Sequence, residues 1–225
     1  MSFIKALYKT ILEAIFPLSP AEKELFSLSP EKAEQSLPRA SASPIPDARG
    51  VLAYKDERVA KLIWNIKYKK SKKATAIGAF ILYKAMRNTS STLNSPDQPI
   101  TIIPMPITIK RRRERGFNQC ELICEEIKKL DSTDRFRVIS NLLVRIQHKD
   151  RQTLKNRSDR LVSARGIFSV DIVILDDLKS KDSQFLNKDV LIIDDVITTG
   201  STMKEALETM RNAGFKKVKG ISIAH

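Results

Sequence analysis

The sequence contains few of the residues that hold small or metal-dependent proteins together. Only two cysteines, Cys120 and Cys124, and two histidines, His148 and His225, occur in 225 residues. Two cysteines do not make a disulfide scaffold, and their i, i+4 spacing predicts two small buried side chains on one helix face. We therefore expect no metal site built on thiol or imidazole ligands, and a reducing cytoplasm as the protein's location.

Long hydrophobic runs are also absent. No apolar stretch approaches the ~20 residues of a membrane-spanning helix, so we expect no transmembrane segment. Residues 1–17 carry apolar side chains at helical spacing, but Lys5, Lys9 and Glu13 interrupt them. The charges exclude the core of a signal peptide and predict an amphipathic helix. Such a helix packs on its own domain, on a membrane or on a partner, and we favour the first.

Basic residues, in contrast, are abundant. Forty Lys and Arg stand against 26 Asp and Glu, a formal charge of +14. This balance favours an anionic partner, such as a phosphorylated small molecule, a nucleic acid or an acidic membrane face, without choosing among them. The same charge is also compatible with a role in solubility alone.

Two parts of the chain differ in composition. Residues 18–48 are rich in Pro, Ser, Ala and Glu, and apart from a short helix at Ala21–Phe26 we expect a linker. We therefore divide the chain into residues 1–48, an N-terminal helical appendage with its linker, and residues 49–225, a folded domain.

Residues 49–225 alternate between strand-like and helical patterns. Strands are expected at Ile100–Met105, Arg137–Val144, Gly166–Ile174, Val190–Ile193 and Val218–Ile223, and helices at Asp56–Ile66, Thr75–Met86, Phe117–Leu130 and Ser201–Ala213. This alternation predicts an α/β domain in which a mainly parallel, twisted sheet is flanked by helices. Ligands of such sheets bind beyond the carboxyl ends of the strands.

The strongest chemical signal is the segment Val190–Thr202, VLIIDDVITTGST. Its first four residues predict a strand that is buried on both faces. Asp194 and Asp195 follow at the carboxyl end, where two adjacent carboxylates are unfavourable without partners. Ribose hydroxyls and a Mg²⁺-bound ligand would supply those partners.

The turn after the acidic pair offers hydroxyls and backbone N–H groups where a helix begins. It consists of Thr198, Thr199, Gly200, Ser201 and Thr202. Glycine lets the backbone approach a ligand, and the helix N-terminus adds partial positive charge, so the turn predicts a monophosphate site. Helix capping alone explains one hydroxyl but not the whole combination. The turn is neither a Walker A loop nor a dinucleotide-binding fingerprint, because it lacks the lysine of the first and the three glycines of the second.

DDVITTGST resembles the motif with which type I phosphoribosyltransferases bind 5-phosphoribosyl 1-pyrophosphate (PRPP). The resemblance implies the type I phosphoribosyltransferase fold, pentosyl transfer as the activity and PRPP as the ligand. It implies that Asp194 and Asp195 contact the ribose at the catalytic centre and that Thr198–Thr202 bind the 5-phosphate. Mg²⁺ is the implied cofactor, bound through PRPP, with the acidic pair as the candidate protein contact.

Other segments resemble the ComF family, a branch of phosphoribosyltransferase-like proteins linked to natural competence. These segments are Tyr54-Lys55-Asp56, Leu62-Ile63, Lys67-Tyr68-Lys69, Pro104-Met105-Pro106, Arg115-Gly116-Phe117-Asn118-Gln119, Gln152, Arg157, Arg160 and Gly166-Ile167-Phe168. The resemblance covers residues 50–225 and implies a role in DNA uptake, with single-stranded DNA and a competence helicase as partners. Many members carry a four-cysteine zinc finger that is missing after Pro17, so we expect no zinc. A homodimer is left open.

Basic residues near the predicted strand ends are further candidate contacts. The arginines that follow Pro106 suit pyrophosphate, because arginine binds phosphate bidentately and keeps its charge. By analogy with other phosphoribosyltransferases we assign residues 106–115 to a pyrophosphate loop, with Arg115 as the first choice and the upstream Arg111, Arg112 and Arg113 as secondary candidates. Lys67 joins them on the strength of the family resemblance. A solvated basic turn is the alternative.

A second basic segment contains Arg151, Arg157 and Arg160, and is expected as a helix or a mobile loop. The resemblance implies a flexible loop that closes over PRPP and excludes water. Contact with single-stranded DNA and a solvated helix are the alternatives.

These observations leave three hypotheses for the function. The first is a Mg²⁺-dependent phosphoribosyltransferase, and the second is a non-catalytic competence factor that binds single-stranded DNA and uses PRPP only as a ligand. The third, a nucleobase salvage phosphoribosyltransferase, is disfavoured. In such enzymes the acceptor-binding segment follows the last strands, whereas here His225 comes directly after Ile221–Ala224.

Overall fold

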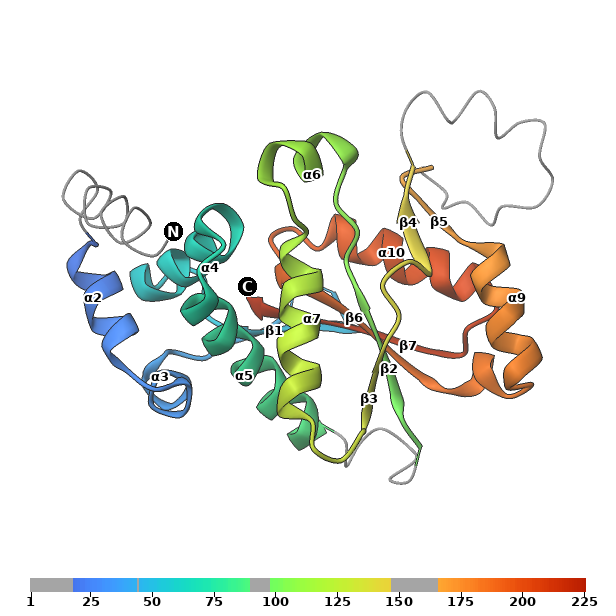
Figure 1. The fold of residues 1–225 in the computed structure, drawn as a ribbon, viewed down its shortest axis with the longest axis horizontal. Helices are drawn as coiled ribbons and strands as arrows, with labels where there is room; N and C mark the ends of the chain where they lie inside the picture. The colour runs from blue at the N-terminus through green and yellow to red at the C-terminus, as the bar shows by residue number, and fades with distance from the viewer. Residues whose placement is uncertain (1–17, 44, 90–97, 147–165) are drawn as a thin grey trace, which may run out of the picture.

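The computed structural model describes residues 18–43, 45–89, 98–146 and 166–225. Five strands form one sheet in the order β1-β7-β6-β2-β3, and every neighbouring pair is parallel (Figure 1). The strands are β1 (Ala48–Leu52), β2 (Ile100–Pro104), β3 (Phe136–Val138), β6 (Asp189–Val196) and β7 (Lys217–Ala224). The predicted α/β class with a mainly parallel sheet is confirmed.

Helices cover both faces of this sheet. One face carries α4 (Glu57–Lys69), α5 (Lys72–Thr89) and α7 (Gln119–Leu130), and the other carries α10 (Ser201–Asn212) with α9 (Ile172–Lys181) beyond it (Figure 1). Side chains of β6 alternate between the two cores: Leu191 and Ile193 pack with α5 and α7, whereas Val190 and Ile192 pack with α10. All four are at most 6% exposed, as expected for a strand buried on both faces.

The order of the strands creates a crevice between β2 and β6. From β2 the chain runs through α6 (Ile109–Arg115) and α7 to β3, whereas from β6 it runs through α10 to β7, on the opposite side. Two neighbouring parallel strands whose connections leave in opposite directions define a topological switch point, where ligands of open α/β sheets bind.

The N-terminal part differs from the predicted linker over residues 18–48. It contains α2 (Pro20–Ser27) and α3 (Pro30–Ser36), and the buried side chains of Leu25 and Ala33 join the core. Each helix has a serine N-cap followed by proline at its first position, where the missing N–H is not needed. Two of the prolines that suggested a linker, Pro20 and Pro30, thus begin helices. The helix predicted within residues 1–17 lies outside the described residues, and the domain boundary at residue 48 stays a prediction.

Two predicted strands are wrong in their extent. The strand predicted at Arg137–Val144 is split: β3 ends at Val138, and β4 (Leu143–Arg145) pairs with β5 (Phe168–Val170) in a separate antiparallel sheet. The strand predicted at Gly166–Ile174 stops at Val170, because the Asp171 side chain accepts two backbone N–H bonds and caps α9.

Strand β1 was not predicted, since its sequence ARGVL has no strand-like alternation. Its glycine is required by a close approach: a Cβ on Gly50 would lie 2.5 Å from the Cβ of His225. Among the described helices, none has the length and apolar character needed to cross a membrane.

Candidate functional site

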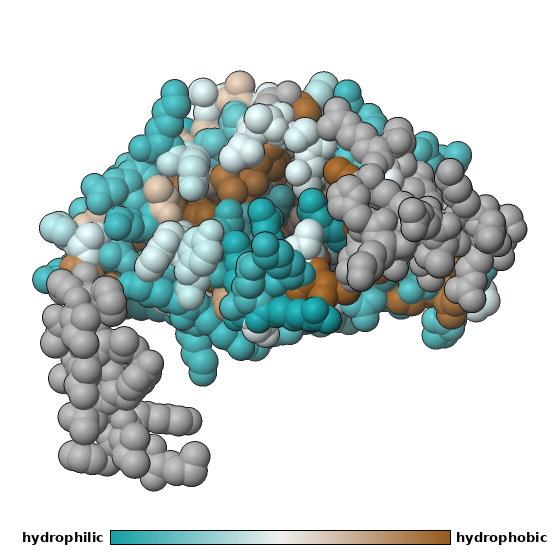
Figure 2. Space-filling view, turned by 90° about the horizontal axis from the view of Figure 1, so that it is seen from above, coloured by the Kyte–Doolittle hydropathy of each residue, from teal (hydrophilic) through white to brown (hydrophobic). Residues whose placement is uncertain are grey.

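A cavity of about 350 Å³ opens at the carboxyl ends of β2 and β6, at the switch point. Figure 2 looks onto this end of the molecule and shows hydrophobic surface in the centre of a largely hydrophilic face. The cavity is lined by Lys67, Tyr68, Met105, Pro106, Ile107, Arg111, Arg115, Gln119, Arg145 and residues 194–203. It therefore brings together the predicted acidic pair and phosphate turn, which are contiguous, with Lys67 and Arg115, so that three separate segments meet.

The two acidic residues of this cavity have different surroundings. Asp195 is 2% exposed, and its Oδ1 lies 3.1 Å from the Nζ of Lys67 on α4. The other oxygen, Oδ2, is buried and has no hydrogen-bond partner among the described residues. A buried carboxylate oxygen without a partner is costly, so this atom is poised to accept a hydrogen bond or to bind a cation.

Asp194 points to the opposite side of β6, as neighbouring strand residues do. Its Oδ1 accepts the backbone N–H of Asp195 at 2.8 Å and lies 3.6 Å from the thiol of Cys120 on α7. Burial, together with the charge of Asp195, raises the pKa of Asp194 to about 7, despite the opposing effects of the Asp195 N–H and Lys67. Near neutral pH, Asp194 is therefore protonated in part of the molecules.

The turn after β6 leads directly into α10. Gly200 is the N-cap residue, with φ of 77°, and has no side chain to cap the helix, while the Thr199 hydroxyl accepts the backbone N–H of Ser201 at 3.5 Å. Thr198, Thr199, Ser201 and Thr202 are exposed to the cavity. Thr199 thus makes one long capping contact, and the residues that begin this 12-residue helix line the cavity, where its first N–H groups can meet an anion.

The segment predicted as a pyrophosphate loop is largely a helix. After a short stretch at residues 105–108, Thr108 caps α6, and the four arginines are distributed around its axis. Arg111 and Arg115, one turn apart, line the cavity. Arg112 instead forms a bidentate ion pair with Glu121, at 2.8 and 2.9 Å. The prediction of an open loop is wrong, because a capped helical turn follows the prolines.

Arg113, a predicted contact, is exposed and is not one of the described residues that line the cavity. Its position on α6 turns it away from the face that carries Arg111 and Arg115. The sequence contained a signal for this difference. Thr108 can cap a helix, and in that helix Arg111 and Arg115, spaced i, i+4, share a face that Arg113 does not. The predicted flexible-loop residues Arg151, Arg157 and Arg160 lie outside the described residues.

The segment Arg115–Gln119 has a separate structural task for each residue. Gly116 ends α6 in the left-handed region, with φ of 76°, and Phe117 is buried. Asn118 caps α7 and donates a hydrogen bond from Nδ2 to the carbonyl of Met105, which ties α7 to the end of β2. The Oε1 of Gln119 accepts a hydrogen bond from Arg115 at 3.0 Å. This segment thus orients Arg115 at the cavity.

Arg145 on β4 is a cavity residue that the sequence did not reveal. Its guanidinium lies 5.3 Å from the ring of Phe168. Burial and the charge of Arg111 lower the pKa of Arg145, while the charges of Glu205 and Asp194 oppose this effect. Arg145 and Arg111 therefore face the same space from two different elements. The local sequence does not predict that Arg145 lines the cavity, because its position there depends on the unpredicted break between β3 and β4.

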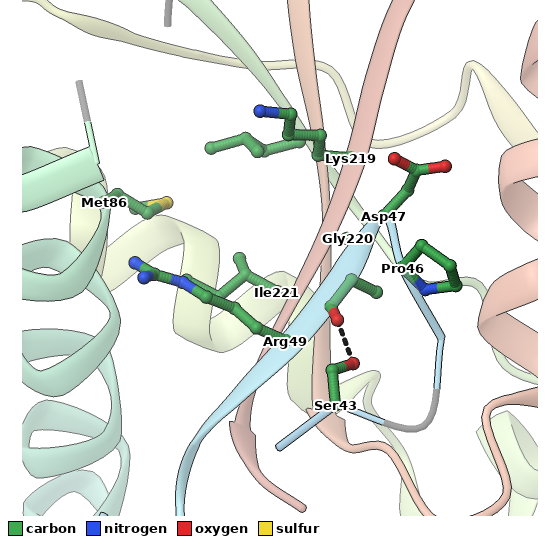
Figure 3. Close-up of a pocket in the computed structure, with 10 residues that line it drawn as sticks. Ser43, Pro46, Asp47, Arg49, Met86, Lys219, Gly220 and Ile221 are labelled. Carbon is green, nitrogen blue, oxygen red and sulfur yellow. Dashed lines mark hydrogen bonds between the residues drawn. The ribbon is translucent and has the colours of Figure 1, made fainter. Parts of the chain in front are cut away.

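A second cavity, of about 250 Å³, lies at the opposite end of the same sheet (Figure 3). Its lining is mostly apolar and includes Met86, Leu191 and Ile221, together with the cationic side chains of Arg49 and Lys219. It contains neither an acidic pair nor a helix N-terminus among its lining residues. The chemistry predicted from the sequence is thus found at the carboxyl end of the sheet.

Comparison with known proteins found both a domain match and similar sequences. A model of the phosphoribosyl transferase domain matches residues 140–224, a range that includes β6, the turn and α10. The chain is similar to competence protein F of Haemophilus influenzae, with 30% identity over 142 residues, or 63% of this chain and 56% of that protein. It is also similar to the competence protein ComFC of Bacillus subtilis, with 30% identity over 127 residues, or 56% of this chain and 45% of that protein.

A more distant similarity, 24% identity over 163 residues, connects the chain to the DNA utilization protein YhgH of Escherichia coli O6:H1, covering 72% of this chain and 64% of that protein. The chain thus spans about half the length of the first two relatives. Together, the parallel sheet and the domain match show a phosphoribosyltransferase fold, and the relatives show that the chain is similar to competence proteins of the ComF type over about half of their length.

Proposed function

We propose that this chain binds PRPP together with Mg²⁺ at the carboxyl ends of β2 and β6 and acts as a phosphoribosyltransferase. One observation carries the proposal. The buried Asp195 has an oxygen without a partner among the described residues, and it lies in the same cavity as the N-terminus of α10, whose N-cap residue is a glycine. A carboxylate that needs a donor or cation and a turn that needs an anion fit a phosphorylated sugar with a bound cation.

The residues present fit a magnesium ion that is held mainly by its ligand. Mg²⁺ keeps several waters and binds through one or two carboxylates plus phosphate oxygens. Asp194 and Asp195 supply the carboxylates, and no group of three or more His, Cys, Asp or Glu residues in the described ranges forms a metal cluster. When bound, the ion would reduce the cost of negative charge on the leaving pyrophosphate.

In this proposal, different residues bind different parts of PRPP. The N–H groups and hydroxyls of residues 198–202 hold the 5-phosphate, and the acidic pair orients the ribose hydroxyls. Arg111, Arg115 and Arg145 bind the pyrophosphate, since guanidinium groups match phosphate oxygens in geometry and charge. In the ligand-free chain Lys67 neutralises Asp195.

Catalysis in this proposal rests on positioning and charge stabilisation. The bond from the ribose C1 to pyrophosphate breaks as a nucleophile attacks C1, and the arginines stabilise the departing charge. The only thiol next to the acidic pair among the described residues, that of Cys120, is an unsuitable covalent nucleophile. Burial first, and then the charges of Asp194 and Asp195, raise its pKa well above the usual value, so it stays protonated.

Isothermal calorimetry with PRPP, in the presence and absence of Mg²⁺, tests the proposal. We expect saturable binding that strengthens with Mg²⁺, and a loss of affinity in Asp195→Asn. Asp47→Asn is the matched control, because Asp47 is an exposed carboxylate at the other end of the sheet. An absence of binding by the unchanged chain, or equal affinity in Asp195→Asn, contradicts the proposal. Pyrophosphate release with trial acceptors then tests turnover.

A second function is favoured by charge and by the relatives' names. The chain has a formal charge of +14, and the relatives are called competence and DNA utilization proteins. As the alternative to catalysis, we propose that the chain handles single-stranded DNA, in the cytoplasm and with a helicase as a candidate partner, and that PRPP is a ligand rather than a substrate. Binding of labelled strands across a salt series tests this: a phosphate-dominated interaction weakens steeply as salt rises. Binding that is absent at low salt contradicts it.

A further inference from the structure

The exposed side of α4 carries two large aromatic rings flanked by cations. Trp64 is 44% exposed and Tyr68 is 59% exposed, with ring centroids 5.9 Å apart and planes tilted by 47°. The Nζ of Lys69 lies 4.9 Å from the Trp64 ring, and the guanidinium carbon of Arg115 lies 4.9 Å from the Tyr68 ring. We call this series of four side chains, Lys69, Trp64, Tyr68 and Arg115, the α4 ladder.

The ladder is not part of the core. The buried side of α4 consists of Val59, Leu62, Ile63, Asn65 and Ile66. Trp64 and Tyr68 lie outside that set, one turn apart, so their rings share the solvent-facing side. Cation–ring contacts on either side restrict the rotamers of both rings, which reduces the entropy that a stacking ligand would otherwise have to overcome.

The ladder also continues into the PRPP cavity. Tyr68 and Arg115 line that cavity, and the residue before Tyr68, Lys67, makes the ion pair with Asp195. Lys70 adds a further charge at the end of α4, with its Nζ 5.4 Å from the Phe117 ring. A ligand on the ladder would therefore lie at the mouth of the cavity, among fixed positive charges.

We propose that the α4 ladder binds unpaired bases of single-stranded nucleic acid, at the rim of the sugar-phosphate cavity. This inference rests on the proposed DNA-handling function and names its contact surface. Every base has a π-face, so stacking on aromatic rings beside lysine and arginine is the usual way in which proteins bind single strands without reading their sequence.

Two features favour a strand over a free nucleotide. The ladder presents two rings in succession, and both are on an open surface, whereas sites for free nucleotides bury most of their ligand in a cavity. Its flanking groups, Lys69, Lys70 and Arg115, are cationic, which suits the repeated phosphates of a strand, although Lys69 also pairs with Glu22 at 3.5 Å.

The chain offers a direct probe, because Trp64 is its single tryptophan. We expect single-stranded oligonucleotides to quench the Trp64 emission in a saturable manner. An abasic oligonucleotide of equal length, which keeps the phosphates but lacks bases, should quench it far less. Double-stranded DNA and a nucleoside monophosphate complete the set, since the first has no unpaired base and the second has one base without a strand.

Variants extend the test to labelled strands followed by fluorescence anisotropy. Trp64→Leu and Tyr68→Leu should each weaken strand binding roughly 5- to 150-fold, the range expected for the loss of one base–aromatic stack. Tyr54→Leu is the matched control, because Tyr54 is 39% exposed but lies outside the ladder. Trp64 does not line the cavity, so Trp64→Leu should leave PRPP binding unchanged in calorimetry.

The outcomes separate this inference from the functions on which it builds. If strands bind with unchanged affinity to both ladder variants, or if abasic and normal strands quench Trp64 equally, the ladder is overturned and DNA handling stands. If no strand binds the unchanged chain, DNA handling and the ladder both fail, while PRPP binding is still measured independently. If a nucleoside monophosphate binds as tightly as a strand, the proposal that the ladder binds a strand is overturned.

Discussion

The two walls of the cavity at the carboxyl ends of β2 and β6 are built in different ways. The acidic wall, Asp194 to Thr202, is a single stretch of chain that leaves a central strand and enters a helix. The basic wall consists of Lys67, Arg111, Arg115 and Arg145, which come from α4, α6 and β4. The first wall is fixed by local geometry, whereas the second depends on how three separate elements pack.

This difference predicts how strongly a substitution in each wall affects the site. A substitution in the acidic wall acts on the strand end or the turn itself, so its effect should be large and local. A substitution in the basic wall removes one of several similar charges, and the remaining arginines compensate in part. The predictions below test this contrast, beginning with the largest expected effect.

Gly200→Val should nearly abolish PRPP binding. The glycine has φ of 77°, a conformation that strains any residue with a branched side chain, and several N–H groups at the start of α10 depend on it. With charge-assisted hydrogen bonds worth about 1.5–3 kcal/mol each, the loss should be about 100-fold or more. Calorimetry measures it, and circular dichroism checks that the chain still folds. Affinity within about threefold of the unchanged chain would mean that the turn does not hold the phosphate.

Arg115→Ala and Arg111→Ala should each weaken PRPP binding by about 10- to 100-fold, the range for one charge-assisted contact to phosphate. Arg113→Ala is the matched control on the same helix, since Arg113 does not line the described cavity. We expect its affinity to change less than about twofold. Equal losses in all three variants would show that only the net charge of α6 matters.

Much of the acidic wall was predictable because its signal is contiguous. The strand, the acidic pair, the turn and α10 follow one another without a break in the sequence. The basic wall was predicted only in part: Lys67 and Arg115 stand in motifs, whereas Arg145 reaches the cavity only because Ser140 and Asn141 interrupt the strand pattern between β3 and β4. Helix α9 was also missed, because its apolar start, Ile172-Val173-Ile174, reads as strand until the Asp171 cap is recognised.

The affinity for PRPP should depend on pH through Asp194, whose pKa is raised to about 7. The ionised form suits a cation-bound sugar, so affinity should rise roughly tenfold between pH 6 and pH 8 and level off above. Asp194→Asn should remove this dependence. Calorimetry at several pH values provides the measurement, and an unchanged pH profile in the variant would exclude Asp194 as its source.

The same group should destabilise the ligand-free chain as pH rises. Because its pKa is higher in the folded than in the unfolded state, the folded chain binds more protons between pH 4 and pH 7, and stability falls across that window. Saturation with PRPP and Mg²⁺ should offset the fall. Thermal unfolding of the unchanged chain and of Asp194→Asn compares the two slopes, and equal slopes would contradict the expectation.

The smallest effect should come from Cys120→Ala. The thiol lies 3.6 Å from Asp194 and opposes the rise of its pKa, so its removal should move the midpoint of the pH profile upward by a fraction of a unit. Cys124→Ala is the control one helical turn away, equally buried but without this contact. Both variants should lose about 1 kcal/mol of stability, and only the first should shift the midpoint.

The most direct test of the central claim is a crystal structure of the chain with PRPP and Mg²⁺. We predict the 5-phosphate on the N–H groups of residues 198–202, the ribose hydroxyls at Asp194 and Asp195, and the pyrophosphate facing Arg111, Arg115 and Arg145. Electron density for PRPP in the opposite cavity beside Arg49, or a turn that stays empty at saturating ligand, would contradict the account.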